Sequence, residues 1–293
     1  MPQLINTISN AHQGLIHALC YDKSGKYILS GAQDRTIYLW NASSGLKIQS
    51  FSFHSQEILD LSITSDSTRF ASAGGDRNVC LWDVTSGKIL ARHSGHLSRI
   101  NSVAFNTDGS VLASASYDKN VRLWDTKSRS HRPIQTLDDA KDSVSSVVIK
   151  DNEIFTGSVD GTLRIYDVRY GKLSNLLLFH PITSVWPSTD SSTVLVSCLD
   201  SVVRLMDKST GTMLQAFKSH ANAQFRIKSF FLNNEEWVVS PSEDGKIYLW
   251  DVVKGNVLHK FGSAGTAYSI SVHPDDRQIA TSTLGGSIEF WSL

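Results

Sequence analysis

Short apolar runs alternate with polar residues along the whole chain, and turn residues interrupt them every few positions. Within residues 99–126, the runs RINSVAF, VLASASY and NVRLWDT are separated by turns at residues 106–109 and 118–119. Alternation over such short runs is typical of β-strands, and Gly and Asp accept the backbone angles of tight turns. Because no apolar repeat of helical period persists, the pattern predicts an all-β protein.

The strand pattern also repeats at a nearly fixed interval. Seven segments place an aromatic residue or Met six residues after an Asp, or after a Gly in the last segment: DRTIYLWN, DRNVCLWD, DKNVRLWD, DGTLRIYD, DSVVRLMD, DGKIYLWD and GGSIEFWS. The landmark residues lie 40 to 44 positions apart: Trp40, Trp82, Trp124, Tyr166, Met206, Trp250 and Trp291. A four-stranded propeller blade takes roughly 40 to 45 residues, so the repeat predicts a seven-bladed β-propeller forming a single domain over residues 1–293.

The two ends of the chain complement each other in this arrangement. The last unit reaches Leu293 just after its third strand, and residues 3–9 form an apolar run ahead of the first unit. We expect this N-terminal run to supply the outer strand of the last blade, so that no sheet edge is left at the seam.

A set of His, Ser, Asp and Trp recurs at similar spacing in four units. Its members are His12, Ser30, Asp34 and Trp40; His54, Ser72, Asp76 and Trp82; His96, Ser114, Asp118 and Trp124; and His220, Ser240, Asp244 and Trp250. The set resembles the triad of a hydrolase, which stays as a distant alternative. A set repeated in several blades suits a structural role better, because buried polar groups must be paired and one fold needs one active site. We therefore predict four stabilising networks and no enzymatic activity.

Composition and charge narrow the function further. The chain has 28 Lys plus Arg and 28 Asp plus Glu, so its formal net charge of zero gives no general attraction to nucleic acid or to anionic membranes. Cys20, Cys80 and Cys198 lie too far apart for a disulfide framework or a zinc site, and no phosphate loop, nucleophile elbow or zinc-binding helix motif occurs. We expect an intracellular, soluble protein without cofactor or metal. The basic stretch at residues 127–132 is interpreted as a solvated turn, with contact to an RNA backbone as the alternative.

Together the seven units resemble WD40-repeat proteins, and the resemblance covers essentially the whole chain. Some units depart from the pattern: the fourth has Asp138, Thr156 and Tyr166, the fifth has Val196 and Met206, and the seventh has Gly285. We expect these blades to lack the full polar network.

The resemblance implies a partner-binding surface on the narrower, top face of the propeller. In similar proteins, each blade contributes the residues on either side of the first inner-strand aliphatic and the residue before the tight-turn Asp. Those positions hold Leu15, His17, Gln33, Glu57, Leu59, Arg99, Asn101, Tyr117, Val159, Leu199, Arg226, Lys228, Glu243, Tyr268 and Leu284, together with the less distinctive Gly75, Ser143, Ser145, Thr183 and Thr266. Apolar and aromatic residues with Arg are typical of interface hot spots, although several could instead pack between blades.

Three stretches are more distinctive than the general repeat. RPIQTLDDAKDSVSSV, FTGSVDGTLRIYDVRYGKL and VSCLDSVVRLMDKSTG are similar to the mitogen-activated protein kinase organizer subgroup of WD-repeat proteins, which also occurs among spliceosome-associated components. The resemblance implies a scaffold in pre-mRNA splicing, beside a G-patch protein or a DEAH-box helicase, or in an extracellular-signal-regulated (ERK) MAP kinase module. We favour splicing because the chain is almost bare propeller. We expect a monomer in the nucleus and cytoplasm that contacts RNA only indirectly and no membrane.

Overall fold

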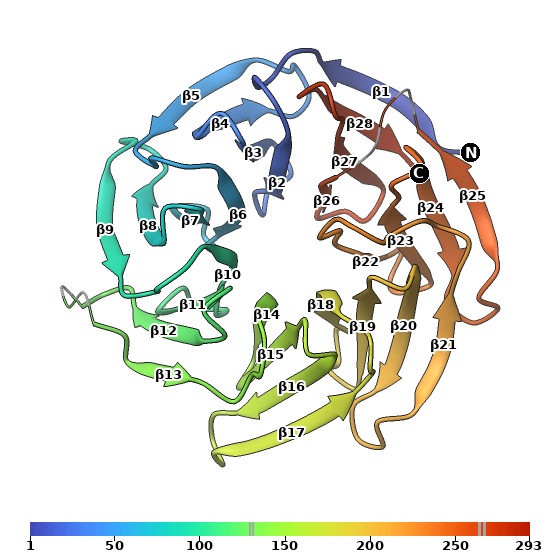
Figure 1. Cartoon of the computed structure of the whole chain (residues 1–293). Coiled ribbons are helices and arrows are strands. Elements are labelled where there is room, and N and C mark those ends of the chain that lie inside the picture. Colours follow the sequence, from blue (N-terminus) through green and yellow to red (C-terminus); the bar gives the residue numbers. More distant parts are fainter. Residues whose placement is uncertain (129, 131, 263–264, 266–267) are drawn as a thin grey trace.

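Seven four-stranded antiparallel sheets stand like blades around a central axis in the computed structural model of residues 1–293 (Figure 1). The structure describes every residue except 129, 131, 263–264 and 266–267. Within that part of the chain only strands, turns and bends occur, so the predicted all-β seven-bladed propeller is confirmed. No helix among the described residues has the length and apolar character needed to cross a membrane.

The strands follow one another from the channel outwards in every blade except the last. The first three blades contain β2 (Ile16–Tyr21), β3 (Tyr27–Ala32), β4 (Thr36–Asn41) and β5 (Lys47–Ser52); β6 (Ile58–Ile63), β7 (Arg69–Gly74), β8 (Asn78–Asp83) and β9 (Ile89–Ser94); and β10 (Ile100–Phe105), β11 (Val111–Ser116), β12 (Val121–Asp125) and β13 (Gln135–Leu137). The next three contain β14 (Val144–Lys150), β15 (Glu153–Ser158), β16 (Thr162–Asp167) and β17 (Lys172–Leu177); β18 (Ile182–Pro187), β19 (Thr193–Cys198), β20 (Val202–Asp207) and β21 (Met213–Phe217); and β22 (Phe230–Leu232), β23 (Trp237–Pro241), β24 (Ile247–Asp251) and β25 (Val257–Phe261). The seventh contains β26 (Ile270–Val272), β27 (Gln278–Ser282), β28 (Ile288–Ser292) and β1 (Gln3–Ile8).

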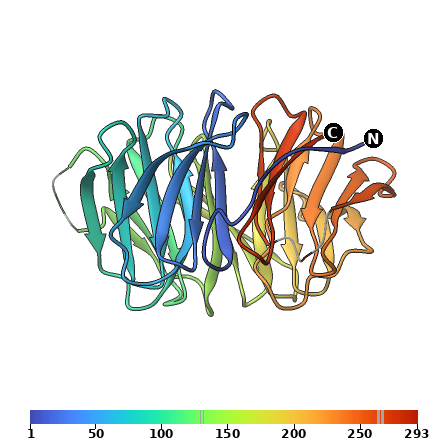
Figure 2. The same ribbon diagram turned by 90° about the horizontal axis from the view of Figure 1, so that it is seen from above.

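The up-and-down order of the strands sorts the loops onto two faces, which Figure 2 shows edge-on. Turns between the second and third strands of a blade and the links from one blade to the next lie on the same face, here called the top face. Turns between the first and second and between the third and fourth strands lie on the bottom face. The tight turns that carry the repeated Asp therefore all belong to the top face.

The N-terminal strand closes the ring. β1 pairs antiparallel with β28, from Gln3 opposite Ser292 to Ile8 opposite Ile288, and the two termini lie close together in Figure 1. The expected clasp of the last blade by the N-terminal segment is confirmed. It joins the N-terminal and C-terminal segments of the chain in one sheet, so the outer edge of β28 is covered.

The hydrophobic core lies between neighbouring blades. Phe51 of the first blade packs edge-on against Phe70 of the second, with ring centroids 4.8 Å apart, and Phe70 stacks on Trp82 at 5.7 Å. All three side chains are almost fully buried. The landmark aromatic residues therefore tie each sheet to the next, which makes the blades a rigid support for the loops above them.

Candidate protein-interaction site

The first blade forms the predicted polar network. His12 Nδ1 lies 3.0 Å from Asp34 Oδ2, and its Nε2 lies 2.7 Å from Ser30 Oγ. The Trp40 indole N–H donates to the same hydroxyl at 2.8 Å, so Ser30 Oγ accepts from Trp40 and donates to His12. Burial lowers the pKa of His12 despite the neighbouring Asp34. A neutral imidazole between a carboxylate and a hydroxyl satisfies every polar group in the chain of contacts.

The second and third blades repeat the geometry, with His–Asp distances of 2.8 and 2.9 Å and His–Ser distances of 2.7 and 2.8 Å. Their members are His54, Ser72, Asp76 and Trp82, and His96, Ser114, Asp118 and Trp124. The three serine side chains are 0% exposed. Because each hydroxyl is sealed inside a blade and already paired, it has no access to a substrate carbonyl, as a nucleophile would need.

The prediction of a fourth network in the sixth blade is wrong. Neither ring nitrogen of His220 has a hydrogen-bond partner, Ser240 Oγ donates to the Pro241 carbonyl at 3.0 Å, and Trp250 donates to the Lys218 carbonyl at 2.9 Å. His220 instead packs against the Trp250 ring, with centroids 5.3 Å apart. Burial lowers the pKa of this histidine to about 4.

Chain spacing and a competing donor explain the missing network. His220 lies 24 residues before Asp244, whereas the separation is 22 in each of the first three blades. Asp244 is occupied by the Tyr248 hydroxyl at 2.8 Å and by Lys260 Nζ at 2.9 Å. The two extra residues displace the imidazole, and Tyr248 and Lys260 supply the donors that the carboxylate requires.

The degenerate blades pair their turn carboxylates with arginines on the third strand. Arg164 binds Asp160 at 2.8 Å in the fourth blade, and Arg204 binds Asp200 in the fifth. In the seventh blade, the Trp291 indole donates to Thr281 Oγ1 at 3.1 Å, which preserves part of the pattern. The fourth and fifth blades therefore use an Arg as the main partner of the turn Asp, and in the fifth blade His180 Nε2 also lies 3.5 Å from Asp200 Oδ2.

The residues predicted to contact partners divide by exposure. The exposed ones are Gln33, Arg99, Tyr117, Val159 and Leu284. The half-buried ones are Leu15, His17, Glu57, Gly75, Leu59, Leu199, Glu243 and Tyr268. The buried ones are Asn101, Ser143, Ser145 and Thr183, and Thr266 lies outside the described residues, as do Arg129 and His131 of the basic stretch.

Asn101 is not available to a partner, which corrects its assignment. Its side chain is 8% exposed, and its amide donates to Ser143 Oγ at 3.1 Å and to the Val144 carbonyl at 2.8 Å. Glu243 is also occupied, because its Oε1 accepts the backbone N–H groups of residues 223–225. Both residues hold the propeller together where the sequence predicted contact with a partner.

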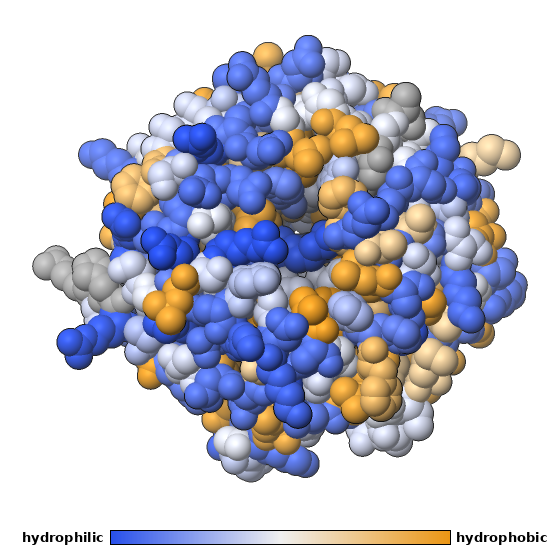
Figure 3. Space-filling model, in the orientation of Figure 1, coloured by the Kyte–Doolittle hydropathy of each residue, from blue (hydrophilic) through white to orange (hydrophobic). Residues whose placement is uncertain are grey.

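Arg226 and Lys228 also differ from the prediction, because their cationic groups cross the central channel. Arg226 donates to the carbonyls of Ser145 at 3.0 Å and Leu59 at 2.6 Å, and Lys228 Nζ lies 2.6 Å from Asp60 Oδ1. The contacts join the sixth blade to the second and fourth. Figure 3 shows a band of hydrophilic residues across the centre of one face, with hydrophobic patches beside it.

Asp60 is a structural residue that the sequence analysis missed. It is 1% exposed and also accepts from Ser102 Oγ at 2.7 Å and from the Val103 N–H at 3.1 Å. Burial by itself raises the pKa of Asp60, but Lys228 and Arg226 outweigh burial and lower it. The sequence does set Asp60 apart, because the other blades have Ala or Ser at the equivalent position of the inner strand.

The top face of the third blade carries an exposed cluster of an apolar, an aromatic and a cationic side chain. Leu97 is 77% exposed, Tyr117 is 52% exposed, and the Arg99 guanidinium lies 5.0 Å from the Tyr117 ring centroid. Leu97 and Tyr117 are anchored by their own backbones, since Leu97 N–H donates to Asp118 at 2.8 Å and Tyr117 N–H to the Arg99 carbonyl at 3.0 Å. Leu97 was absent from the prediction, although it directly follows the His landmark.

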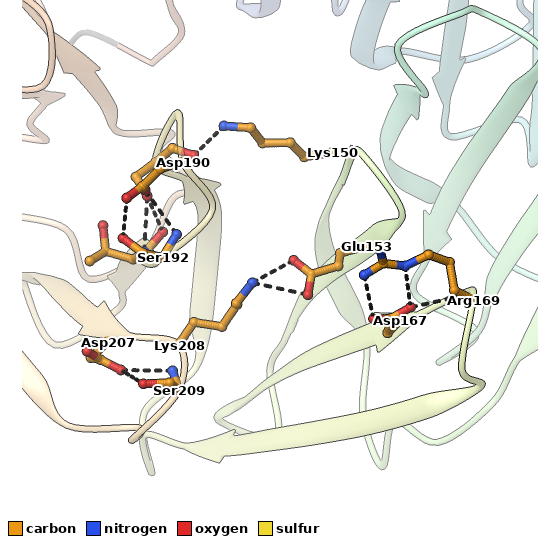
Figure 4. Close-up of polar contacts among 11 residues, drawn as sticks. Lys150, Glu153, Asp167, Arg169, Asp190, Ser192, Asp207, Lys208 and Ser209 are labelled. Atoms are coloured by element: carbon orange, nitrogen blue, oxygen red, sulfur yellow. Dashed lines mark hydrogen bonds and ion pairs between the residues drawn. The ribbon is translucent and has the colours of Figure 1, made fainter.

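On the bottom-face side of the Arg226 and Lys228 contacts, the central channel contains a cavity of about 730 Å³ that opens towards the bottom face. Trp186 and Phe230 line it, with ring centroids 4.6 Å apart. On the bottom face, Lys208 of the fifth blade binds Glu153 of the fourth at 2.9 Å (Figure 4). The described residues contain no cluster of His, Cys, Asp and Glu suited to a metal ion.

Comparison with known proteins agrees with this geometry. A family model described as "WD domain, G-beta repeat" matches residues 2–41, 45–83, 87–125, 131–167, 211–251 and 255–292. The unmatched stretch 168–210 covers the first three strands of the fifth blade, where Val196 and Met206 depart from the pattern.

Curated relatives match over nearly the whole chain. An uncharacterized WD repeat-containing protein of Schizosaccharomyces pombe is 55% identical over 270 residues, which cover 91% of each chain. WD repeat domain-containing protein 83 of Rattus norvegicus is 48% identical over 95% of this chain and 89% of its own length. The Homo sapiens protein of that name is 46% identical over 99% of this chain and 92% of its own length.

Proposed function

The chain belongs to the WD40-repeat family, and from that premise we propose that it is a non-enzymatic adaptor that binds other proteins through the top face of its propeller. The observation that carries the proposal is the exposed cluster of Leu97, Arg99 and Tyr117 above the third blade. Aromatic residues and Arg supply most of the energy of protein interfaces, and here rigid strands hold them in place.

The polar networks support an adaptor over an enzyme. Ser30, Ser72 and Ser114 are buried and fully paired, and the sixth blade lacks the contacts of a triad altogether. A hydrolase needs its nucleophile beside an open site where a substrate can bind. The sets that look catalytic in the sequence are accounted for by their contribution to stability.

We further propose that this adaptor acts in pre-mRNA splicing, where it binds a G-patch protein, a DEAH-box helicase or both. The similarity of the degenerate fourth and fifth units to a subgroup that includes spliceosome-associated components supports this context. In this proposal the protein is a monomer in the nucleus and cytoplasm, and it contacts RNA only through its partners. Organisation of an ERK MAP kinase module is the alternative context.

Affinity purification of the full chain from nuclear extract, followed by mass spectrometry, tests the proposal. We expect the wild-type chain to recover a DEAH-box helicase or a G-patch protein, and Tyr117→Ala and Arg99→Glu to lose it without a change in melting temperature. Tyr170→Ala is the matched control, because Tyr170 is 78% exposed in a turn on the bottom face.

Two outcomes contradict parts of this proposal. Full recovery by both Tyr117→Ala and Arg99→Glu excludes the exposed cluster of the third blade as the binding surface. Recovery of ERK-cascade proteins in place of splicing components supports the signalling context instead.

A further inference from the structure

The tight turns of the top face differ between the two halves of the ring. In the first three blades, the residue after the turn Asp is Arg35, Arg77 or Lys119. In the fourth, sixth and seventh blades, the same position holds Gly161, Gly245 or Gly286. All six have positive φ, between 65° and 82°. A side chain at such an angle is strained, whereas Gly adopts it freely. The three cations are therefore placed where backbone conformation alone favours Gly.

In the first three blades the turn Asp pairs with a histidine of the polar network, so it does not pair with Arg35, Arg77 or Lys119. In the first blade, the charge of Asp34 is directed inwards to His12 at 3.0 Å, and His54 and His96 pair with Asp76 and Asp118 in the same way. In the fourth to sixth blades, Arg164, Arg204 and Lys260 bind the turn carboxylates, and in the fifth blade the half-exposed His180 adds a longer contact of 3.5 Å to Asp200. Among the described residues, the turn Asp thus pairs with a histidine and no Lys or Arg in the first three blades, and with a strand cation in the fourth to sixth.

The free cations form what we call the basic arc: Arg35, Arg77, Arg99 and Lys119. All four side chains are exposed, and in the described part of the chain none of them forms an ion pair. They lie on three consecutive blades, whose inner strands β2, β6 and β10 contact one another in turn. Leu97 and Tyr117 stand beside the arc on the third blade.

We propose that the basic arc binds an acidic peptide segment that carries an apolar residue, the carboxylates contacting the four cations and the apolar side chain packing on Leu97 and Tyr117. This inference rests on the proposed function, because it names the chemistry of the partner at the same face. Arginine pairs well with carboxylates, and apolar contact beside the charges supplies affinity that salt does not screen.

A peptide fits this surface better than a nucleic-acid backbone. The formal net charge of the chain is zero, and the carboxylates of Asp34, Asp76 and Asp118 lie just below the arc. A polyanion held by phosphates alone needs a strong and continuous positive field. An exposed Leu side chain gains nothing from phosphates, whereas it packs against an apolar residue of a peptide.

A phage library of random peptides, panned on the purified full chain, tests the proposal. We expect enriched peptides to contain several Asp or Glu together with Leu, Phe or Trp, and to bind less tightly as salt is raised. The key variant combines Arg35→Gly, Arg77→Gly and Lys119→Gly, which removes three charges from positions suited to Gly. We expect its affinity for the selected peptides to fall at least about tenfold, with a melting temperature equal to or above the wild type.

The matched control combines Lys23→Ser, Lys26→Ser and Lys88→Ser, which removes three exposed cations from turns on the bottom face and should leave binding unchanged. Peptides without acidic bias, equal binding by the triple-Gly variant, or a lack of enrichment overturns the proposal. If single-stranded poly(U) RNA binds the wild-type chain more tightly than the selected peptides do, and the triple-Gly variant loses this binding, the proposal is overturned in favour of nucleic acid. The adaptor function is judged separately, by the partners that Tyr117→Ala loses.

Discussion

Lys228 Nζ and Asp60 Oδ1 lie 2.6 Å apart across the central channel, although 168 residues separate them along the chain. Asp60 belongs to the inner strand of the second blade, and Lys228 precedes the inner strand of the sixth. Asp60 also accepts from Ser102 of the third blade at 2.7 Å. One carboxylate therefore links three blades, and the ion pair ties opposite sides of the ring together.

Removal of either member of this pair is expected to destabilise the protein. Asp60→Ala leaves Lys228 without its counter-charge, and Lys228→Met leaves a carboxylate that is 1% exposed without its ammonium partner. Breaking a buried pair on one side costs about 3 kcal/mol. We expect losses of about this size in the free energy of unfolding, measured by urea denaturation.

The double variant separates the ion pair from general effects of substitution. With both charges removed, no unpaired charge remains, so Asp60→Ala with Lys228→Met should be less destabilised than the sum of the single variants by at least about 1 kcal/mol. Lys26→Met on the bottom face serves as a control and should leave stability unchanged. Strict additivity of the two single variants would show that the contact is energetically unimportant.

The acidic members of the His networks are expected to make stability depend on pH. Burial by itself raises the pKa of Asp118, but the contact from His96 and the Leu97 N–H outweigh it and lower the pKa to about 2. Because the pKa in the folded state lies below the unfolded value of about 3.9, the stabilisation is complete above pH 4 to 5 and is lost as the pH falls towards 2.

Asp118→Asn should therefore cost about 1 to 3 kcal/mol at neutral pH and much less near pH 2.5. The comparison needs chemical denaturation of variant and wild type at both pH values. Asp151→Asn, in an exposed turn on the bottom face, is the control and should show no such dependence. A difference between Asp118→Asn and wild type that is equal at both pH values would contradict the assignment.

The histidines of the third and sixth blades should respond differently to the same substitution. His96→Leu removes one hydrogen bond from Ser114 and one from Asp118, although Trp124 and the Leu97 N–H still donate to them, and the loss should cost about 1 to 3 kcal/mol. His220 has no hydrogen-bond partner on either ring nitrogen, so His220→Leu should change stability by less than about 0.5 kcal/mol or increase it. Thermal denaturation of the two variants decides the matter, and equal losses would show that His220 is hydrogen-bonded in solution.

The difference between these histidines shows how far the sequence leads. The fold followed from local alternation and from the spacing of the landmark residues, both of which are set by contacts within a blade and with its neighbour. The prediction of a network in the sixth blade was wrong because it matched residue types and not their spacing. His220 and Asp244 are 24 residues apart, whereas His and Asp are 22 residues apart in the first three blades. A shift of two residues moves the buried His220 imidazole out of hydrogen-bond reach of Asp244.

The contacts across the channel could not be predicted from the repeat pattern, for a different reason. Periodicity aligns equivalent positions in successive blades, but it does not indicate which side chains are long enough to meet at the axis. Arg226 and Lys228 were assigned to partner binding because their positions matched the top face, whereas the buried carbonyl of Leu59 and the carboxylate of Asp60 engage them within the channel. An Asp among the small residues of the other inner strands was the available signal.

The N-terminal strand offers a direct test of ring closure. Deletion of residues 1–10 removes β1, exposes the edge of β28 and takes away the side chain of Ile8, which is 8% exposed in the intact ring. Loss of this burial and of the strand's hydrogen bonds should lower stability by at least about 3 kcal/mol, with a marked drop in melting temperature measured by circular dichroism. Ile5→Ser is the control, because Ile5 is 53% exposed and falls at the register shift between Leu4 and Asn6. The deletion acts on a strand that is first in sequence and last in the ring, so an unchanged melting temperature would mean that the seventh blade is stable with three strands and that closure does not depend on the clasp.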